Sequence, residues 1–211
     1  MDVGIQQGGI ESSVPYTVRD TTLQALELLM TEDEAALAAQ WYSEPDADGL
    51  RYLSKDADTA AAELESAFTT PDVVLYMAAA QNAARVAGST ETVTPTIYDL
   101  DAVSQQFAAM AQAPGAREML QNQLAGAISQ LDGTVADNLA SQAVLLVSLE
   151  YEAQGIAHDV QMAYLLRIGG QMLGLTLLMV AAAVAVGFIA SRVSAAIGRD
   201  LRRKVFSTVV G

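Results

Sequence analysis

The longest apolar stretch of the chain is an uncharged run of 23 residues from Ile168 to Ala190. Only Gln171 and Thr176 within this run are markedly polar. At a rise of about 1.5 Å per residue, a helix over the run extends about 34 Å, which exceeds a hydrocarbon core of about 30 Å. A buried core helix rarely presents apolar side chains on every face over such a length. The pattern therefore predicts a transmembrane helix over residues 164–190.

Shorter amphipathic patterns cover most of the preceding chain and predict helices. Thr31 with Glu34 forms a capping box, and Gly88 suits the end of a helix. Pro71 follows Thr70 and predicts a break between two helices. The first helix is expected to begin at Ser13, with Pro15 in its first turn. The predicted helices cover residues 13–30, 31–42, 58–68, 70–88, 99–112 and 114–131, with loops at 44–58 and 89–99.

After Thr134 the chain has no proline, and a helical pattern continues without a clear stop from about Val135 to Phe206. At about 1.5 Å per residue, this stretch corresponds to a helix of about 105 Å. It predicts one long rod that starts in an outer domain, crosses the membrane and continues into the cytoplasm. Gly155 is the expected position of a bend. The predicted fold class is all-α.

Charge is distributed unevenly about the apolar run. Residues 1–166 hold 24 acidic and five basic residues, whereas residues 167–211 hold one acidic and six basic residues. Basic residues gather at the cytoplasmic end of membrane helices. We therefore expect a cell-membrane protein with residues 1–163 outside the cell and the C-terminus in the cytoplasm. The strongly acidic outer part also excludes a nucleic-acid surface, because it would repel phosphate.

These patterns predict four parts in the chain. A short segment (1–12) precedes an acidic helical outer domain (13–163), which leads into the transmembrane helix (164–190) and the start of a cytoplasmic helical extension (191–211). The first four residues, Met1 to Gly4, lack both the basic start and the apolar core of a signal peptide. An outer N-terminal part without an export signal leads us to expect an earlier membrane segment ahead of Met1.

The sequence offers no candidate catalytic, cofactor-binding or metal-binding residue. The stretch 44–49 matches the start of an EF-hand loop, but Lys55 occupies the twelfth position, where a bidentate Glu is needed. We interpret this stretch as a solvated acidic loop. The one histidine, His158, is next to Asp159 but has no second ligand three or four residues away on the same helix face. The chain has no cysteine and no Walker A loop, so it has no signature of thiol chemistry or of ATP binding.

Two further features of the membrane region are candidates for contacts. Gly170 and Gly174 have the GxxxG spacing that lets another membrane helix approach closely. The stretch 190–206 then continues as a helix with an apolar side and several basic residues. A generic positive-inside stop is the simpler interpretation of that basic stretch.

The order of residues in this stretch nevertheless resembles the end of the second transmembrane helix in ABC exporters that fuse membrane and nucleotide-binding domains. There a helix of small residues leads into an R…A…(G/A)RDLRxxVF pattern before the first coupling helix. The stretch from Tyr164 to Leu173 is similar to the outer start of that helix. The stretch from Asp2 to Gly9 is similar to the D-x-G-I segment that lies just outside the first transmembrane helix of these exporters. The resemblance covers about 55 residues, at both ends of the chain.

The resemblance implies a fragment of a half-transporter with a type 1 transmembrane domain and a large helical insertion in its first extracellular loop. The parent would pair with an identical or different second half and export an unknown substrate. It would hydrolyse ATP with Mg²⁺ in a nucleotide-binding domain outside this chain. The transmembrane helix would frame the translocation pathway. The residues expected to transmit motion between the ATPase and the membrane are Arg199, Asp200, Arg202, Arg203 and Phe206.

Two other functions remain open. A single-pass receptor or sensor would bind a ligand with its acidic helical domain and signal through the rod, and it requires a downstream signalling module. A free-standing membrane adaptor would require Met1 to be the true start of the protein. An exporter instead requires a first membrane helix upstream and a Walker A loop some hundreds of residues downstream.

Overall fold

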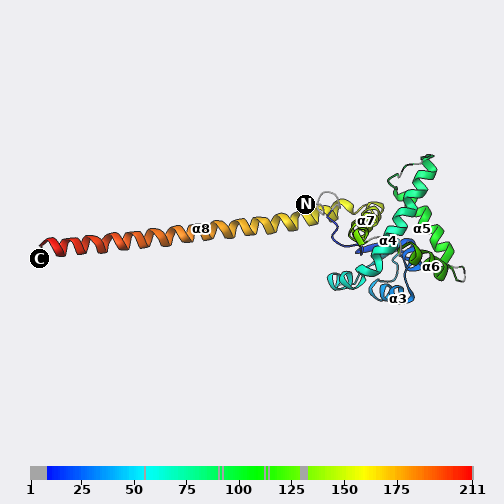
Figure 1. Ribbon diagram of the computed structural model, residues 1–211, viewed down its shortest axis with the longest axis horizontal. Helices are drawn as coiled ribbons and strands as arrows, with labels where there is room; N and C mark the ends of the chain where they lie inside the picture. Colours follow the sequence, from blue (N-terminus) through cyan, green and yellow to red (C-terminus); the bar gives the residue numbers. More distant parts are fainter. Residues whose placement is uncertain are drawn as a thin grey trace. The chain divides into compact units, whose positions relative to one another are not determined.

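The computed structural model describes residues 9–54, 56–89, 91, 93–111, 113, 115–128 and 133–210 (Figure 1). Contacts divide the chain into a helical unit (Met1–Tyr164) and a C-terminal unit (Leu165–Gly211). The described chain is mostly helical, as the sequence predicts. Its elements are β1 (Thr17–Arg19), α2 (Asp20–Leu29), α3 (Glu32–Trp41), β2 (Leu50–Tyr52), α4 (Ala57–Ala87), α5 (Ile97–Ala111), α6 (Ala116–Ile128), α7 (Gly133–Ala153) and α8 (Ala157–Val210).

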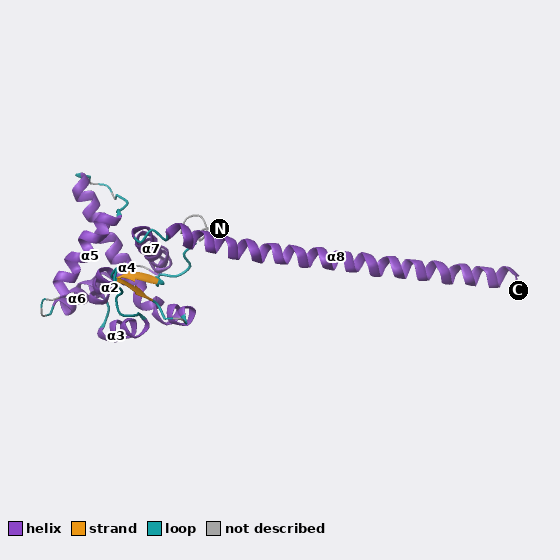
Figure 2. Ribbon diagram, turned by 180° about the vertical axis from the view of Figure 1, so that it is seen from behind, coloured by secondary structure: helices purple, strands orange, loops and turns teal. Residues whose placement is uncertain are grey.

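Two short strands are the exception to the all-α prediction. β1 and β2 pair antiparallel, with Val18 opposite Arg51, and Figure 2 draws them in orange. The predicted helix start at Ser13 is wrong, because residues 13–16 are not helical and α2 begins at Asp20. The residue before Pro15 is biased toward extended backbone, and the β-branched Val18 is fully buried on one face of the strand. The loop predicted at 44–58 is likewise wrong in part, since it contains β2.

Helix α3 begins as predicted. The side chain of Thr31 accepts a hydrogen bond from the backbone N–H of Glu34, and the Glu34 carboxylate accepts one from the backbone N–H of Thr31 at 2.9 Å. Three acidic residues in the first turn also stabilise the helix, because their negative charges lie near the positive end of the helix dipole. The helix ends before Tyr42, whose ring packs 5.9 Å from that of Phe68 in the core.

Helix α4 runs through Pro71 without a break, so the predicted division at Thr70 is wrong. A proline inside a helix removes one backbone hydrogen bond and costs about 3 kcal/mol. Burial opposes that cost, because Leu64, Phe68 and Leu75 on both sides of the proline are fully buried in the main core. Gly88 ends this helix in the left-handed conformation, as predicted.

The predicted single rod is wrong, because the chain divides into α7 and α8, although the interruption lies at Gly155, where a bend was expected. Gly155 has a φ of 74°, and its N–H donates to the carbonyl of Glu152 at 3.0 Å. The N–H of Ile156 donates to the carbonyl of Tyr151 at 3.0 Å, which completes a Schellman motif. The sequence pattern alone does not show that α7 ends here, because a glycine inside a periodic stretch is compatible with either a bend or a stop.

Replacing Gly155 by alanine is expected to lower the free energy of unfolding of the helical unit by about 1 kcal/mol. A Cβ at this position meets nothing within 4 Å, so the cost comes from the left-handed backbone alone. Gly155→Asn is the matched control and should cost less, since asparagine tolerates this conformation. Denaturation of the full chain in detergent, followed by the fluorescence of its single tryptophan, measures both variants. Equal stability of wild type and Gly155→Ala would contradict the Schellman assignment.

Helices α5 and α6 lie close to their predicted positions. α5 starts slightly earlier than predicted, where Asp99 accepts hydrogen bonds from the backbone N–H (3.0 Å) and hydroxyl (2.6 Å) of Thr96. The predicted end of the next helix at Leu131 lies outside the described residues. Helix α4 contacts α2, α3, α5 and α7, so it is the central helix of the unit.

Candidate functional site

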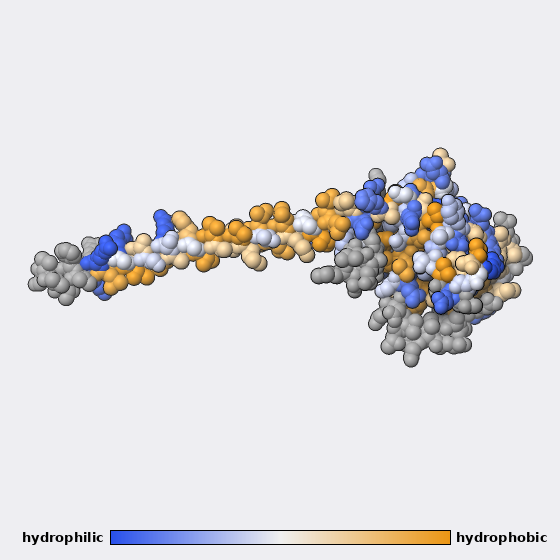
Figure 3. All heavy atoms as spheres, turned by 90° about the horizontal axis from the view of Figure 1, so that it is seen from above, coloured by the Kyte–Doolittle hydropathy of each residue, from blue (hydrophilic) through white to orange (hydrophobic). Residues whose placement is uncertain are grey.

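Among the described residues, α8 is the one helix long and apolar enough to cross a membrane. None of its apolar window, which lies within Ala157–Arg202, is buried, and Figure 3 shows exposed apolar side chains along it in orange. The hydroxyls of Thr176 and Ser191 donate to the carbonyls of Met172 (2.8 Å) and Phe188 (2.9 Å) on the same helix. These hydroxyls therefore need no water, which suits a helix surrounded by hydrocarbon.

The two glycines predicted to pack against another helix both lie in α8. A Cβ at Gly170 or at Gly174 meets nothing within 4 Å, so neither is in close contact with another part of the described chain. Their role in helix packing stays a prediction.

The predicted coupling residues all lie in the last part of α8. The side chains of Arg199 and Asp200 are 3.9 Å apart and are 82% and 76% exposed, so their ion pair is weak. Arg202 is also exposed. The side chains of Arg203 and Phe206 lie outside the described part of the structure.

The two ends of the helical unit meet. Gly9, with a φ of 82°, lies against α8, and a Cβ added to it would be 2.8 Å from the Cβ of Tyr164 and 3.4 Å from the Cα of Gln161. Only glycine fits this close approach. Ile10 follows and is buried with Val147 in a small hydrophobic cluster beside the start of α8. The first described residue of this unit therefore lies beside its last residue, Tyr164.

The segment that follows, residues 13–19, is bound to the last turns of α7 and is called the strap below. The backbone N–H of Tyr16 donates to the Tyr151 hydroxyl at 2.8 Å. Gln154 donates to the carbonyl of Thr17 at 3.1 Å, and the Thr17 hydroxyl donates back to the Gln154 side chain. Burial raises the pKa of Tyr151 far above neutral pH, so its hydroxyl stays protonated.

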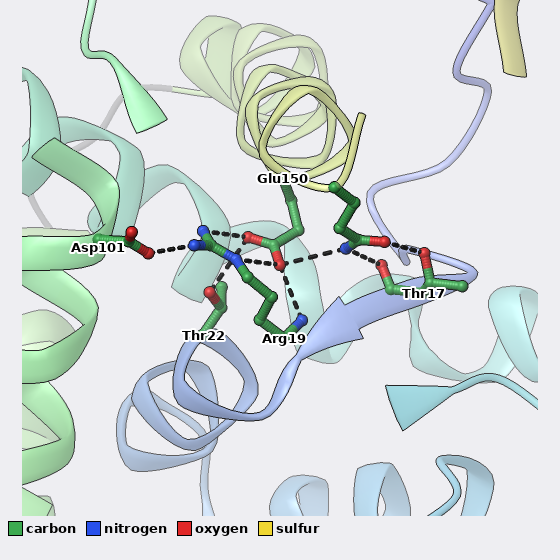
Figure 4. Close-up of polar contacts among 6 residues, drawn as sticks. Thr17, Arg19, Thr22, Asp101 and Glu150 are labelled. Carbon is green, nitrogen blue, oxygen red and sulfur yellow. Dashed lines mark hydrogen bonds and ion pairs between the residues drawn. The ribbon is translucent and has the colours of Figure 1, made fainter. Parts of the chain in front are cut away.

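The strongest polar contacts of the strap join Arg19 to Glu150. The Arg19 guanidinium donates to both Glu150 oxygens, each at 2.9 Å, and the Arg19 backbone N–H donates to the same carboxylate at 2.8 Å (Figure 4). Thr22 donates to it at 3.1 Å, and Arg19 also pairs with Asp101. Glu150 is only 1% exposed, so a buried carboxylate connects β1, α2 and α7 and, through Arg19, α5.

The ionisation of Arg19 reflects a balance between burial and these contacts. Burial alone would lower its pKa. The hydrogen bonds and negative charge of Glu150, together with Asp101, outweigh burial and raise the pKa above its ordinary value. Arg19 is therefore a permanent cation that compensates the buried Glu150.

A second buried carboxylate, Asp72, has no compensating partner among the described residues. It lies on α4, is completely buried, and neither of its side-chain oxygens has a hydrogen-bond partner within the described structure. Burial raises its pKa well above the ordinary value, and the negative charge of Glu150 raises it further. Asp72 is therefore held in the protonated form to a higher pH than an exposed aspartate.

We expect Asp72→Asn to stabilise the helical unit in a pH-dependent way. The unfolded chain ionises Asp72 near pH 4, whereas the folded chain keeps it protonated above that pH. The wild-type free energy of unfolding thus falls as the pH rises from about 4 to the folded-state pKa of Asp72. Above that pKa it falls no further, because Asp72 is then ionised in both states. The variant lacks this loss. Its stability relative to wild type should therefore be lowest below about pH 4 and should rise between pH 4 and pH 7. A difference that does not change with pH would contradict this assignment.

An open cleft of about 580 Å³ lies between α2 and α6. Glu27 lines it and is half-buried, so burial raises the pKa of this carboxyl, while the charges of Arg51 and Arg117 lower it. Arg117 donates to the backbone carbonyl of Glu27 at 3.2 Å. Its lining mixes polar side chains, such as Gln24, Glu118 and Gln121, with the apolar side chains of Leu28 and of three alanines. It is a shallow polar surface feature with none of the convergent geometry of an active site.

The acidic loop interpretation of residues 44–49 agrees with the local geometry. Asp46 turns inward and accepts hydrogen bonds from the backbone N–H groups of Asp48 and Leu50, each at 2.9 Å, and from the Tyr52 hydroxyl at 2.8 Å. The bond from Leu50 and then that from Tyr52 lower the pKa of Asp46 most. Within the described residues no three ligating side chains are grouped to hold a metal ion. Lys55 lies outside those residues.

The sequence interpretation missed the polar contacts at Arg19, Glu150 and Asp72. A signal was present for Glu150, because it ends an apolar stretch in which Leu146 and Leu149 are buried. Arg19 is also one of only five basic residues among the first 166. The pairing between them spans more than 130 positions, so spacing along the chain did not reveal it.

No protein-family model matches the chain, and no match is found among curated proteins or among solved structures. Function therefore has to be inferred from the residues and the geometry of the chain itself.

Proposed function

We propose that this chain is the outer domain and second transmembrane helix of an ABC exporter half-transporter. The helical unit would be an insertion in the first extracellular loop. The contact of Gly9 with Tyr164 carries this proposal, because a domain inserted between two neighbouring membrane helices must begin and end at the same place. A domain attached by one end has no such requirement.

The charges support the orientation. The acidic helical unit would lie outside the cell, and the basic end of α8 would lie in the cytoplasm, as the positive-inside rule requires. The protein would belong to the cell membrane.

The length of α8 supports a cytoplasmic extension. Its 54 residues correspond to about 81 Å, while about 20 residues suffice to cross a bilayer. The residues after Ala190 would continue about 30 Å into the cytoplasm. There Arg199 to Phe206 would transmit motion from a nucleotide-binding domain that uses ATP and Mg²⁺. Ile168 to Ala190 would frame the pathway of an unknown substrate, beside a second half-transporter.

Reading the native coding region on both sides of this segment tests the proposal. The exporter predicts an apolar run of about 20 residues upstream and a GxxxxGK[ST] loop downstream. A stop codon just after Gly211 with no upstream apolar run would contradict it. A downstream signalling module instead of an ATPase would favour a single-pass receptor or sensor.

The insertion itself is tested by removing it from the full-length protein. Because the ends of the unit meet, a short glycine linker can replace residues 10–163. The shortened transporter should insert into the membrane and hydrolyse ATP. If the linker variant fails to insert while the full-length protein inserts, the helical unit is part of the membrane domain's fold and is no insertion.

A further inference from the structure

The basic end of α8 follows directly after the apolar run, and the inference below rests on the proposed membrane-spanning role of this helix. We propose that Arg192, held by Phe188, binds the phosphate of anionic lipid headgroups at the cytoplasmic face of the membrane. Arg199 would contribute weakly and Arg202 least.

The position of Arg192 relative to the apolar run supports a headgroup contact. It lies two residues after Ala190, which is about 3 Å along the helix axis. Each headgroup layer is about 5–8 Å thick, so Arg192 lies within that layer when the run occupies the hydrocarbon core. Its guanidinium stacks over the Phe188 ring, 5.7 Å from the ring centroid. The contact keeps the cation beside the last turn of the run, because an aromatic face attracts a cation.

Arg199 lies on the same side of α8 as Arg192, Arg202 lies near that side, and both are farther from the membrane. At 100° per residue, Arg199 points within about 20° of the direction of Arg192, and Arg202 within about 80° of it. Along the axis, Arg199 lies about 13 Å and Arg202 about 18 Å beyond Ala190. Electrostatic attraction in physiological salt decays over about 8 Å. Contributions to headgroup binding should therefore fall in the order Arg192, Arg199, Arg202.

An acidic protein partner would give a different order. A protein surface docked along this face would contact Arg199 and Arg202, which lie beyond the headgroup layer, at least as strongly as Arg192. Both side chains are exposed, and within the described part of α8 Arg199 has a 3.9 Å ion pair with Asp200. The stacking of Arg192 on a residue of the apolar run favours the lipid, because this stacking holds the guanidinium at the boundary of the membrane.

Spin-labelled lipids test the proposal in the full chain. The chain is reconstituted in phosphatidylcholine vesicles that contain trace spin-labelled phosphatidylglycerol or, in parallel, spin-labelled phosphatidylcholine. The motionally restricted fraction of each label gives the preference for the anionic lipid. We expect a preference of up to about fivefold, the effect of one basic residue near an anionic surface, and it should weaken as salt is added.

The variants separate charge, stacking and position. Arg192→Gln should remove most of the preference, and Phe188→Leu should reduce it. Arg192→Lys should keep much of it, since the charge remains. Arg199→Gln should reduce the preference for the anionic lipid less than Arg192→Gln does, and Arg202→Gln should reduce it least. Arg85→Gln on α4, whose guanidinium donates to Asn82 at 2.8 Å, is the control and should leave the preference unchanged.

Two results would overturn the lipid site. One is an equal affinity for both lipids in wild type. The other is a loss from Arg202→Gln as large as that from Arg192→Gln, which would point to an acidic protein partner. Alkaline carbonate extraction of the vesicles distinguishes failure of the lipid site from failure of the proposed membrane-spanning role. A chain that stays in the vesicles without lipid preference refutes the lipid site alone, whereas a chain released by carbonate refutes the membrane-spanning role.

Discussion

Arg19→Met is expected to lower the free energy of unfolding of the helical unit by about 3–5 kcal/mol, the largest loss of any substitution considered for that unit. The variant removes the cation and leaves Glu150 buried without a charge partner, although Glu150 is only 1% exposed. Thr22, Gln154 and the backbone N–H of residue 19 still donate to the carboxylate, but these neutral hydrogen bonds do not replace a bidentate ion pair. Methionine retains most of the buried volume of the arginine stem, so the loss measures the charge rather than a cavity.

Chemical denaturation of the full chain in detergent measures this effect. Trp41, the single tryptophan, lies in the helical unit and reports its unfolding. Arg19→Met combined with Glu150→Met is the control. Removing both partners should cost about 2 kcal/mol less than the sum of the single losses, because no buried charge remains. Losses that simply add would mean that the two side chains do not depend on each other.

The second large effect concerns α8. Met179→Asp together with Ala183→Asp should abolish insertion into the membrane, because each aspartate near the centre of a bilayer costs about 2.5–3.5 kcal/mol. Both positions lie on the uncharged run and are exposed. Ala195→Asp, beyond the end of the run, is the matched control and should insert normally. Carbonate extraction measures the inserted fraction for each variant. Normal insertion of the double variant would show that α8 does not cross the membrane.

Much of the helical pattern was predictable from local sequence. The capping box at Thr31 and the glycine end at Gly88 are signals whose geometry depends on adjacent residues, and both are confirmed. The helix predicted from Ser13 and the break predicted at Pro71 are wrong for the opposite reason. Packing against distant partners contributes at each position: Ser13 is buried against α4, where its hydroxyl donates to the Glu65 carbonyl at 3.4 Å. Pro71 is held inside a helix by the packing of its neighbours.

The contacts of the strap could not be predicted from spacing. Tyr16 bonds to Tyr151 and Arg19 to Glu150, at separations of 135 and 131 positions. Such pairs depend on how α7 returns to β1, which periodicity alone does not specify. The meeting of Gly9 and Tyr164 likewise depends on the complete fold, and it is the feature on which the proposed insertion rests.

The strap also connects the two ends of the unit. Glu150, Tyr151 and Gln154 bind the strap within the last turns of α7, immediately before the chain turns at Gly155 into α8. Loss of the Arg19 contact should therefore loosen the entry and exit of the unit together. Hydrogen exchange of Arg19→Met should show faster exchange at residues 13–19 and at 150–156 than at the N-terminal half of α3, which the strap does not bind.

Single-cysteine labelling tests the central claim, that α8 crosses the membrane with the helical unit outside. The chain has no cysteine, so each introduced thiol is unique. Thr59→Cys on α4, Leu177→Cys in the apolar run and Ala195→Cys after it are all exposed positions. In intact cells, a membrane-impermeant maleimide should label only Thr59→Cys; permeabilisation should add Ala195→Cys, and Leu177→Cys should stay unlabelled. Labelling of both Thr59→Cys and Ala195→Cys in intact cells, or of Ala195→Cys alone, would contradict the account.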